Sequence, residues 1–219
     1  QRQMCIRDRC VSALTALKVK QGDIVTVAMP STPEALYMVY ALNKIGAVAN
    51  MIHPLAGEKE LLHYLDEVNS EVAVLFEGTY KIIADSIHTT AVQKAVVVSA
   101  GDSLPFGIKQ LYMLKNKLPK FAPDGMFMNW KQFISLGKGI KTTPVKKDSN
   151  AMAVISHTGG TTGEPKGVMC SDGNINALIW QIGCNLPRGR QERYLVVLPP
   201  FINYSLVNTM LEPLSFGFR

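Results

Sequence analysis

The sequence predicts an α/β fold in which a mostly parallel sheet is covered by helices on both faces. Two observations carry this prediction. Short apolar runs of strand length alternate along the chain with segments of helical period about ten residues long. Parallel strands need crossover connections of this kind, and the crossover helices bury both faces of the sheet.

The first hundred residues contain the clearest alternation. An amphipathic segment over 11–18 is followed by a turn at Gly22-Asp23 and the apolar strand 24–29. Pro30 ends this strand, and the next residues form a helix start with an early proline and an acid in the first turn, so a helix is predicted over 35–45. The same pattern then predicts strands over 47–52, 72–76 and 95–99 and helices over 57–68 and 80–88.

Residues 100–150 are interrupted by prolines and glycines, and we expect a connecting region with short helical pieces. A second block with strand and helix patterns opens at 151. There we predict strands over 151–156, 167–169 and 194–198, and helices over 174–182 and near 206–214. Together these segments predict one partial domain over residues 10–219, with a first sheet block over about 10–100, a connection over about 100–150 and a second block over about 151–219.

The two ends of the chain are abrupt. Residues 1–9 have neither helical nor strand period and resemble a translated sequencing-adapter tail, so we expect a non-native tail there. At the other end the chain stops just past an apolar, helix-like run. We therefore expect truncation at both ends.

Composition excludes several classes of protein. The chain has 219 residues, 47% hydrophobic and 18% charged, which fits a folded core and excludes disorder. No stretch approaches the roughly 18 consecutive apolar residues of a membrane span, so no integral membrane segment is predicted. The net charge is +6, of which residues 1–9 supply +2, and the lysines of the remainder fall in scattered patches without interleaved aromatic residues, which disfavours nucleic-acid binding.

Cysteine and histidine usage points to a cytoplasmic protein without a histidine- or cysteine-bound metal. The four cysteines form no CxxC pair, and no signal peptide opens the chain. The four histidines show no zinc-site spacing, so structural roles are expected for them.

Residues 156–169 are the most distinctive segment, reading Ser-His-Thr-Gly-Gly-Thr-Thr-Gly-Glu-Pro-Lys-Gly-Val-Met. Glycines let successive backbone N–H groups turn toward an anion, while threonine hydroxyls and a lysine add donors and positive charge. A simple hairpin turn needs one or two glycines and does not call for three hydroxyls and a lysine. The segment therefore predicts phosphate binding, with candidate residues Thr158, Gly159, Gly160, Thr161, Thr162, Gly163 and Lys166.

The common phosphate and nucleophile motifs do not fit. A Walker loop requires GxxxxGK[ST] between a strand and a helix, whereas Lys166 precedes Gly167 and both flanks have strand character. The pattern is not GxGxxG either. The segment 101–105 lacks the closing glycine of the serine-hydrolase GxSxG elbow.

Residues 158–167, Thr-Gly-Gly-Thr-Thr-Gly-Glu-Pro-Lys-Gly, resemble the phosphate-loop signature of the adenylate-forming superfamily, in particular acyl-CoA synthetases. Two further segments, 22–48 and 198–206, are similar in order and spacing to the amino-terminal stretch of that family and to a later core motif that helps form its carboxylate pocket. The resemblance covers residues 11–219. The chain departs from the pattern at Ile202, where many members have histidine, at Gly159, where serine is frequent, and at Cys170-Ser171-Asp172, where Leu-Thr-His is commoner.

The resemblance implies a two-step reaction. A carboxylic acid, by this likeness a fatty acid, attacks ATP to give an acyl-adenylate and pyrophosphate, and the thiol of coenzyme A then takes the acyl group. By this likeness residues 158–163 cradle the β- and γ-phosphates and Lys166 is the catalytic residue that neutralises charge or positions the loop. Mg²⁺ bridges phosphate oxygens with Thr161 in its shell, and Phe201, Asn203 and Tyr204 bind the acid substrate.

Two other functions stay open at the level of sequence. The chain could belong to an adenylation domain that loads a carrier protein instead of coenzyme A, or to a non-catalytic ATP-binding module. The later family motifs, which include Tyr-Gly-x-Thr-Glu and a carboxy-terminal lysine, are absent from these 219 residues. We therefore expect the chain alone to be inactive. The apolar positions 175, 178, 179 and 182 are expected to be the core face of a helix and not the wall of a pocket.

Overall fold

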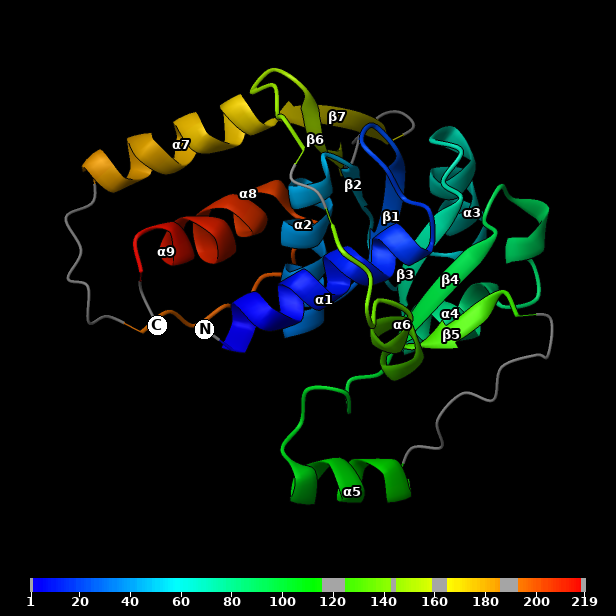
Figure 1. The fold of residues 1–219 in the computed structure, drawn as a ribbon. Helices are drawn as coiled ribbons and strands as arrows, with labels where there is room; N and C mark the ends of the chain where they lie inside the picture. The colour runs from blue at the N-terminus through cyan, green and yellow to red at the C-terminus, as the bar shows by residue number, and fades with distance from the viewer. Residues whose placement is uncertain (1, 116–124, 143–144, 159–164, 186–192, 218–219) are drawn as a thin grey trace.

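The computed structural model describes residues 2–115, 125–142, 145–158, 165–185 and 193–217 (Figure 1). Within them seven strands form a single sheet in the order β5-β4-β3-β1-β2-β6-β7. Neighbouring strands are parallel throughout, except that the edge strand β7 is antiparallel to β6. The predicted α/β class is confirmed. The second sequence block does not make a sheet of its own, because β6 joins the first block beside β2.

Six of the seven predicted strands lie within two residues of their predicted bounds. The strands observed in the described residues are β1 (Ile24–Ala28), β2 (Val48–Met51), β3 (Val72–Phe76), β4 (Lys94–Val98), β5 (Phe127–Asn129), β6 (Met152–Thr158) and β7 (Lys166–Ser171). Parallel strands buried on both faces are continuous apolar runs, which is why the sequence locates them well. The strand β5 was not predicted, and it adds a parallel strand within the expected connecting region.

Helices cover both faces of this sheet (Figure 1). They are α1 (Arg2–Ala16), α2 (Pro33–Ile45), α3 (Glu58–Glu67), α4 (Glu77–Ile83), α5 (Phe106–Lys115), α6 (Trp130–Leu136), α7 (Asp172–Asn185), α8 (Asn203–Ser205) and α9 (Glu212–Ser215), with a 3-10 turn at Ile87–Thr89 and a π-helical turn at Leu206–Leu211. The start of α2 is the predicted one: the Thr32 hydroxyl accepts the Ala35 N–H, and Pro33 occupies the first turn. Gly46, with φ of 81°, ends the helix in the left-handed conformation.

Two apolar clusters lie on opposite faces of the sheet. The larger one joins α1, α2, α6, α7 and the π-helical turn to the strands. The smaller one joins α3 and α4 to the other face, through Leu61, Tyr64, Leu65 and Ile83. Alternate residues of each strand point to opposite clusters, so Thr26 and Asn50, which are register partners, both lie on the face that α3 covers.

Three predicted elements differ from the structure. The helix α1 begins at Arg2, although residues 1–9 show no period; its buried residues Cys10 and Leu14 pack in the larger cluster, and Lys44 of α2 pairs with Asp8 at 2.8 Å. The foreign origin of residues 1–9 stays a prediction. The helix expected over 80–88 is α4 followed by the separate 3-10 turn.

The third correction concerns residues 194–198, where a strand was predicted. The structure has no regular element there, and Leu195 and Val197 are 85% and 73% exposed. An apolar run therefore gave a wrong strand prediction because no neighbouring strand pairs with it in the described part of the chain.

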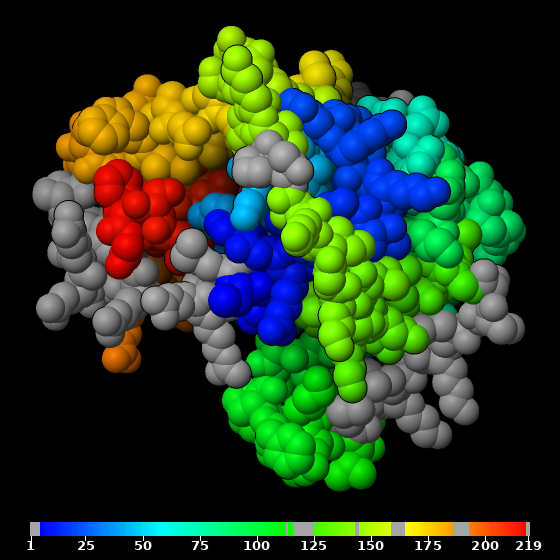
Figure 2. All heavy atoms as spheres, in the orientation of Figure 1, coloured from blue at the N-terminus to red at the C-terminus, as the bar shows by residue number. Residues whose placement is uncertain are grey.

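The helix α5 stands away from the sheet at the bottom of Figures 1 and 2. Its apolar side chains Phe106, Ile108, Leu111 and Leu114 are exposed. Among the described residues no helix has the length and apolar character required to cross a membrane.

Candidate functional site at the carboxyl edge of the sheet

The predicted phosphate segment connects β6 and β7 at one edge of the sheet. The parallel strands β1, β2 and β6 all end at this edge. On either side of the segment, Thr158 and Lys166 are register partners, and the Thr158 hydroxyl donates to the Lys166 carbonyl oxygen at 3.4 Å. The Lys166 side chain is exposed. The predicted residues Gly159, Gly160, Thr161, Thr162 and Gly163 lie outside the described residues.

The predicted substrate segment reaches the same edge from a distant part of the sequence. Phe201 packs on His53, the second residue after β2, with ring centroids 4.5 Å apart. The Ser31 hydroxyl, just beyond β1, donates to the Leu198 carbonyl oxygen at 2.9 Å. Contacts between residues this far apart in sequence place the segment across the ends of β1 and β2.

The three predicted substrate residues have different surroundings. Phe201 is partly buried against the larger cluster, and the Asn203 amide donates to the Cys170 sulfur of β7 at 3.4 Å. Tyr204 is 63% exposed. The structure therefore brings Phe201 and Asn203 to the sheet, while Tyr204 faces solvent.

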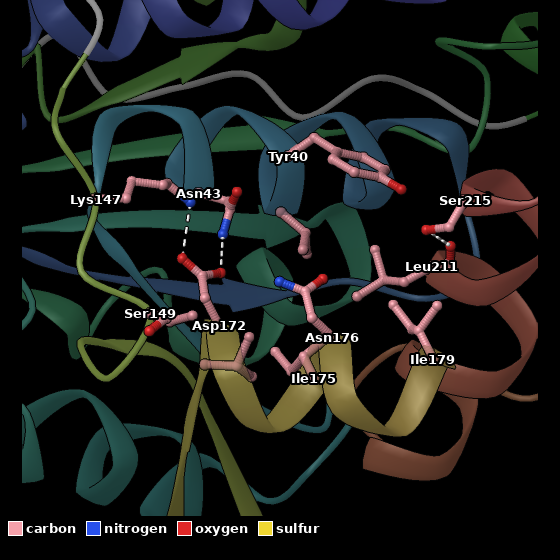
Figure 3. Close-up of a pocket in the computed structure, with 13 residues that line it drawn as sticks. Tyr40, Asn43, Lys147, Ser149, Asp172, Ile175, Asn176, Ile179, Leu211 and Ser215 are labelled. Atoms are coloured by element: carbon pink, nitrogen blue, oxygen red, sulfur yellow. Dashed lines mark hydrogen bonds and ion pairs between the residues drawn. The ribbon is translucent and has the colours of Figure 1, made fainter. Parts of the chain in front are cut away.

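A cavity of about 320 Å³ opens between α2, α7 and the π-helical turn (Figure 3). Asp172 in its wall accepts hydrogen bonds from Asn43 at 2.5 Å and from Lys147 at 2.9 Å. Ile175 and Ile179 are buried in the larger cluster, as predicted, whereas Leu178 is exposed. The prediction that this face forms no pocket wall is wrong, because Ile175 and Ile179 line the cavity. Neither Thr158 nor Lys166 lines this cavity.

A second cavity, of about 230 Å³, lies beside the end of β1. Ser31, Thr32 and Leu36 form one wall, and Tyr194, Val196 and Met210 contribute to the other. Most of the exposed surface in this cavity is apolar. It can accept an apolar group at the same edge of the sheet as the phosphate segment.

Sequence reasoning missed a buried polar cluster below the phosphate segment. Its centre is Asn50 on β2, which is fully buried. The Asn50 amide nitrogen donates to the Thr26 hydroxyl at 3.1 Å and to the Tyr64 carbonyl oxygen at 3.3 Å. Its amide oxygen is 2.8 Å from His157 Nε2. An asparagine inside the otherwise apolar strand Val-Ala-Asn-Met was the signal that could have indicated this cluster.

His157 immediately precedes Thr158, and its side chain is only 6% exposed. Its ring packs on Tyr64, with centroids 4.2 Å apart. Burial lowers the pKa of His157, and the carboxylate of Glu67 on α3 partly offsets this effect. The neutral imidazole is therefore the form that the fold favours.

The described part of the chain contains no group of three or more histidine, cysteine or acidic side chains arranged to hold a metal ion. A magnesium ion bound through phosphate oxygens does not need such a group, because Mg²⁺ keeps several waters and few protein ligands. An exposed lysine and a threonine hydroxyl at a strand-end loop suit a phosphate.

The fold and the position of this loop define an open α/β protein with its candidate ligand site at the carboxyl ends of parallel strands. The model of the AMP-binding enzyme family matches residues 6–219, and the chain belongs to this family. The matched range includes residues 6–9 of the segment expected to be a non-native tail.

Known relatives and structures agree with this assignment. The chain is 28% identical over 210 residues to the long-chain-fatty-acid–CoA ligase of Bacillus subtilis, covering 92% of this chain and 37% of that protein. It is 28% identical over 182 residues to the 3-hydroxypropionyl-coenzyme A synthetase of Metallosphaera sedula, covering 80% of this chain and 27% of that protein. The chain thus spans 37% and 27% of the length of these two curated relatives.

Solved structures support the fold alone. An anthranilate CoA ligase in complex with anthranoyl-AMP superposes with a TM-score of 0.80 at 16% identity, over 97% of this chain and 37% of that one. A long-chain-fatty-acid–CoA ligase from Archaeoglobus fulgidus gives a TM-score of 0.75 at 21% identity, over 98% and 38% of the two chains.

Proposed function

We propose that this chain is the amino-terminal part of an acyl-CoA ligase that activates a carboxylic acid with ATP and transfers the acyl group to coenzyme A. The observation that carries the proposal is the glycine- and threonine-rich sequence between Thr158 and Lys166, together with the position of these two residues at the carboxyl end of β6. Family membership supports it, because the matched relatives are named as CoA ligases and synthetases.

In the first step a carboxylate oxygen of the acid attacks the α-phosphorus of ATP. The bond from that phosphorus to the bridging oxygen breaks, and pyrophosphate leaves. Fixed donors around the phosphates lower this barrier because they need not reorient as charge develops. We assign this role to Lys166 and to residues 158–163. Mg²⁺ would neutralise phosphate charge, with Thr161 as its proposed protein ligand.

In the second step the sulfur of coenzyme A attacks the acyl carbon, and AMP leaves with the electrons of the broken C–O bond. The substrate supplies the nucleophile in both steps, so the chain needs no catalytic serine or cysteine. Phe201, Asn203 and Tyr204 are the proposed contacts to the acid.

We propose a fatty acid as the acid substrate. The apolar cavity beside the end of β1 supports this choice, because an acyl chain would be removed from water there. The name of the B. subtilis relative also supports a long chain, whereas the name of the M. sedula relative refers to a short hydroxy acid.

The test uses the whole protein, obtained by reading the parent gene on both sides of these 219 residues. Pyrophosphate release is measured with ATP and acids of graded length, and thioester formation with and without coenzyme A. Release that requires an acid, followed by thioester formation that requires coenzyme A, supports the proposal. Thioester formation only on a carrier protein favours an adenylation domain, and ATP binding without pyrophosphate release for any acid contradicts the ligase function.

Replacing Lys166 tests the proposed phosphate contact. We expect Lys166→Ala to lower kcat/KM for ATP by about a hundredfold, since one preorganised donor contributes about 3 kcal/mol. The control is Lys131→Ala, which removes an exposed lysine on α6. Equal kcat/KM values for the Lys166 variant and the wild type would remove this residue from the mechanism.

A further inference from the structure

His157 has a hydrogen-bond partner that identifies its tautomer. The Tyr64 carbonyl oxygen can only accept, so the Asn50 nitrogen must face it and the Asn50 oxygen must face His157. An amide oxygen can only accept as well. Nε2 of His157 therefore carries a proton and donates to Asn50 at 2.8 Å.

The other ring nitrogen of His157, Nδ1, is buried and has no hydrogen-bond partner among the described residues. Oε2 of Glu67 lies 3.9 Å from it, which is too long for a hydrogen bond. Among the described residues, the only hydrogen-bond partner of the ring is thus Asn50, through Nε2.

The β6–β7 hairpin is fitted closely around this ring. His157 and Gly167 are register partners, and a Cβ atom at Gly167 would lie 3.2 Å from Ile155 Cγ2 and 3.5 Å from His157 Cε1. The ring therefore lies between the hairpin and α3, with Tyr64 against it. The next pair along the hairpin is Thr158 and Lys166, the first and last of the predicted phosphate-binding residues.

We propose that His157 is a positioning residue for ATP: its Nε2–H···Asn50 bond adds a side-chain contact where the β2–β6 ladder ends at Ser156, and so fixes where the next residue pair, Thr158 and Lys166, lies. This inference rests on the proposed function, because it assumes that the phosphates bind between these two residues. The chain of contacts runs from Thr26 on β1 through Asn50 on β2 to His157 on β6. His157 itself need not touch the nucleotide.

Two matched variants separate positioning from simple packing. Glutamine places its amide nitrogen three bonds beyond Cβ, as histidine places Nε2, so His157→Gln keeps the donor. Methionine has the same length and no donor, so His157→Met keeps the volume and loses the bond. His88→Met is the control, because His88 is exposed on the 3-10 turn at Ile87–Thr89.

The measurement is the dissociation constant for Mg-ATP of the whole protein, by titration calorimetry, together with the thermal midpoint without nucleotide. We expect His157→Met to weaken ATP binding about tenfold, as expected for one lost buried hydrogen bond, and His157→Gln to stay within about threefold of the wild type. If His157→Met does not fold, Thr26→Val removes the other end of the chain of contacts and should weaken binding about threefold.

Equal ATP affinity in wild type, His157→Met and Thr26→Val would overturn the inference, even if the thermal midpoints fall, because His157 would then be a core residue only. Absence of ATP binding by the wild type would overturn it as well. Tight ATP binding that depends on His157, without pyrophosphate release for any acid, would support the positioning role and contradict the ligase function.

Discussion

At the scale of single residues, Asn50 and His157 show how a buried polar pair is tolerated in an apolar sheet. The amide nitrogen of Asn50 donates to Thr26 and to the Tyr64 carbonyl oxygen. Its amide oxygen accepts from His157 Nε2. Leaving the Asn50 amide nitrogen, its amide oxygen or His157 Nε2 without a partner would cost about 1–3 kcal/mol, so the loss of either side chain destabilises the fold. Hydrogen bonding of the buried Asn50 side chain on β2 therefore depends on His157 of β6.

Acid should weaken the fold through His157. Its folded pKa is below the ordinary 6.5, mainly because of burial, so the unfolded chain binds a proton more readily. The contribution to the free energy of unfolding is complete above pH 6.5 and is lost as the pH falls below 6.5 through the folded pKa. Glu67, His63 and Glu60 on α3 are the titratable neighbours that modify the pKa of His157.

The measurement is urea unfolding between pH 5 and 7.5 for the wild type and His157→Gln. The free energy of unfolding should fall more steeply with decreasing pH in the wild type than in the variant. Parallel curves would mean that His157 is already protonated in the fold or that it is not buried as described.

At the scale of elements, one buried carboxylate attaches α5 to the sheet. Glu77, at the start of α4, accepts hydrogen bonds from the Ser99 hydroxyl at 2.9 Å and from the Ala100 N–H at 3.3 Å, and a third from the Tyr112 hydroxyl. Gly101 allows the Tyr112 ring to approach, since a Cβ there would be 3.0 Å from it. Tyr112 is thus the residue that holds an otherwise exposed helix.

Alkaline pH should release this contact. Burial, and then the hydrogen bond to Glu77, raise the pKa of Tyr112 to about 12, so the fold favours the neutral phenol. Its contribution is complete below the ordinary value of 10 and is lost as the pH rises from about 10 to 12. In Tyr112→Phe the free energy of unfolding should depend less on pH in this range, as measured by urea titrations, and equal slopes would contradict the proposed contact.

The elements also show what sequence could and could not predict. The strand over 72–76 was located to the residue, because a buried parallel strand is a local apolar run. The strand over 194–198 failed because strand formation needs a neighbour, which no local pattern reveals. The helix α1 was missed before residue 11 because packing against α2 and α6, and not its own period, stabilises it.

One part of the candidate site could also be predicted from the sequence, and another part could not. Its composition predicts phosphate contacts at Lys166 and Thr158, since glycine, threonine and lysine together favour anion binding. The cluster beneath them could not be found locally, because Asn50 and His157 are 107 residues apart in sequence. Their pairing follows only from the placement of β6 beside β2.

At the scale of the whole molecule, the connecting region returns to the amino-terminal helix. Gly137 ends α6 where α6 meets α1, and a Cβ there would lie 2.6 Å from the Ala13 nitrogen and 2.8 Å from Ser12 Cβ. The obstructing atoms belong largely to backbone and cannot rotate away. The helix α6, which lies within this region, therefore packs directly on α1.

Gly137→Ala should lower the free energy of unfolding by about 2 kcal/mol, because overpacking against a fixed backbone forces the two helices apart. The control is Gly107→Ala on α5, where a new Cβ meets no atom within 4 Å and the helix should gain slightly. Both are measured by urea unfolding at pH 7. A Gly137 variant as stable as the wild type would show that α1 and α6 are not packed this closely.

The strand order has a consequence for synthesis on the ribosome. The strands β1 to β5 are complete by residue 129, while β6 begins only at residue 152. During that interval β2 is an edge strand whose backbone N–H and C=O groups on one side lack partners. A nascent chain paused in this interval exposes a template for pairing with another polypeptide, and arrival of β6 closes that edge and brings His157 to Asn50 in a single event.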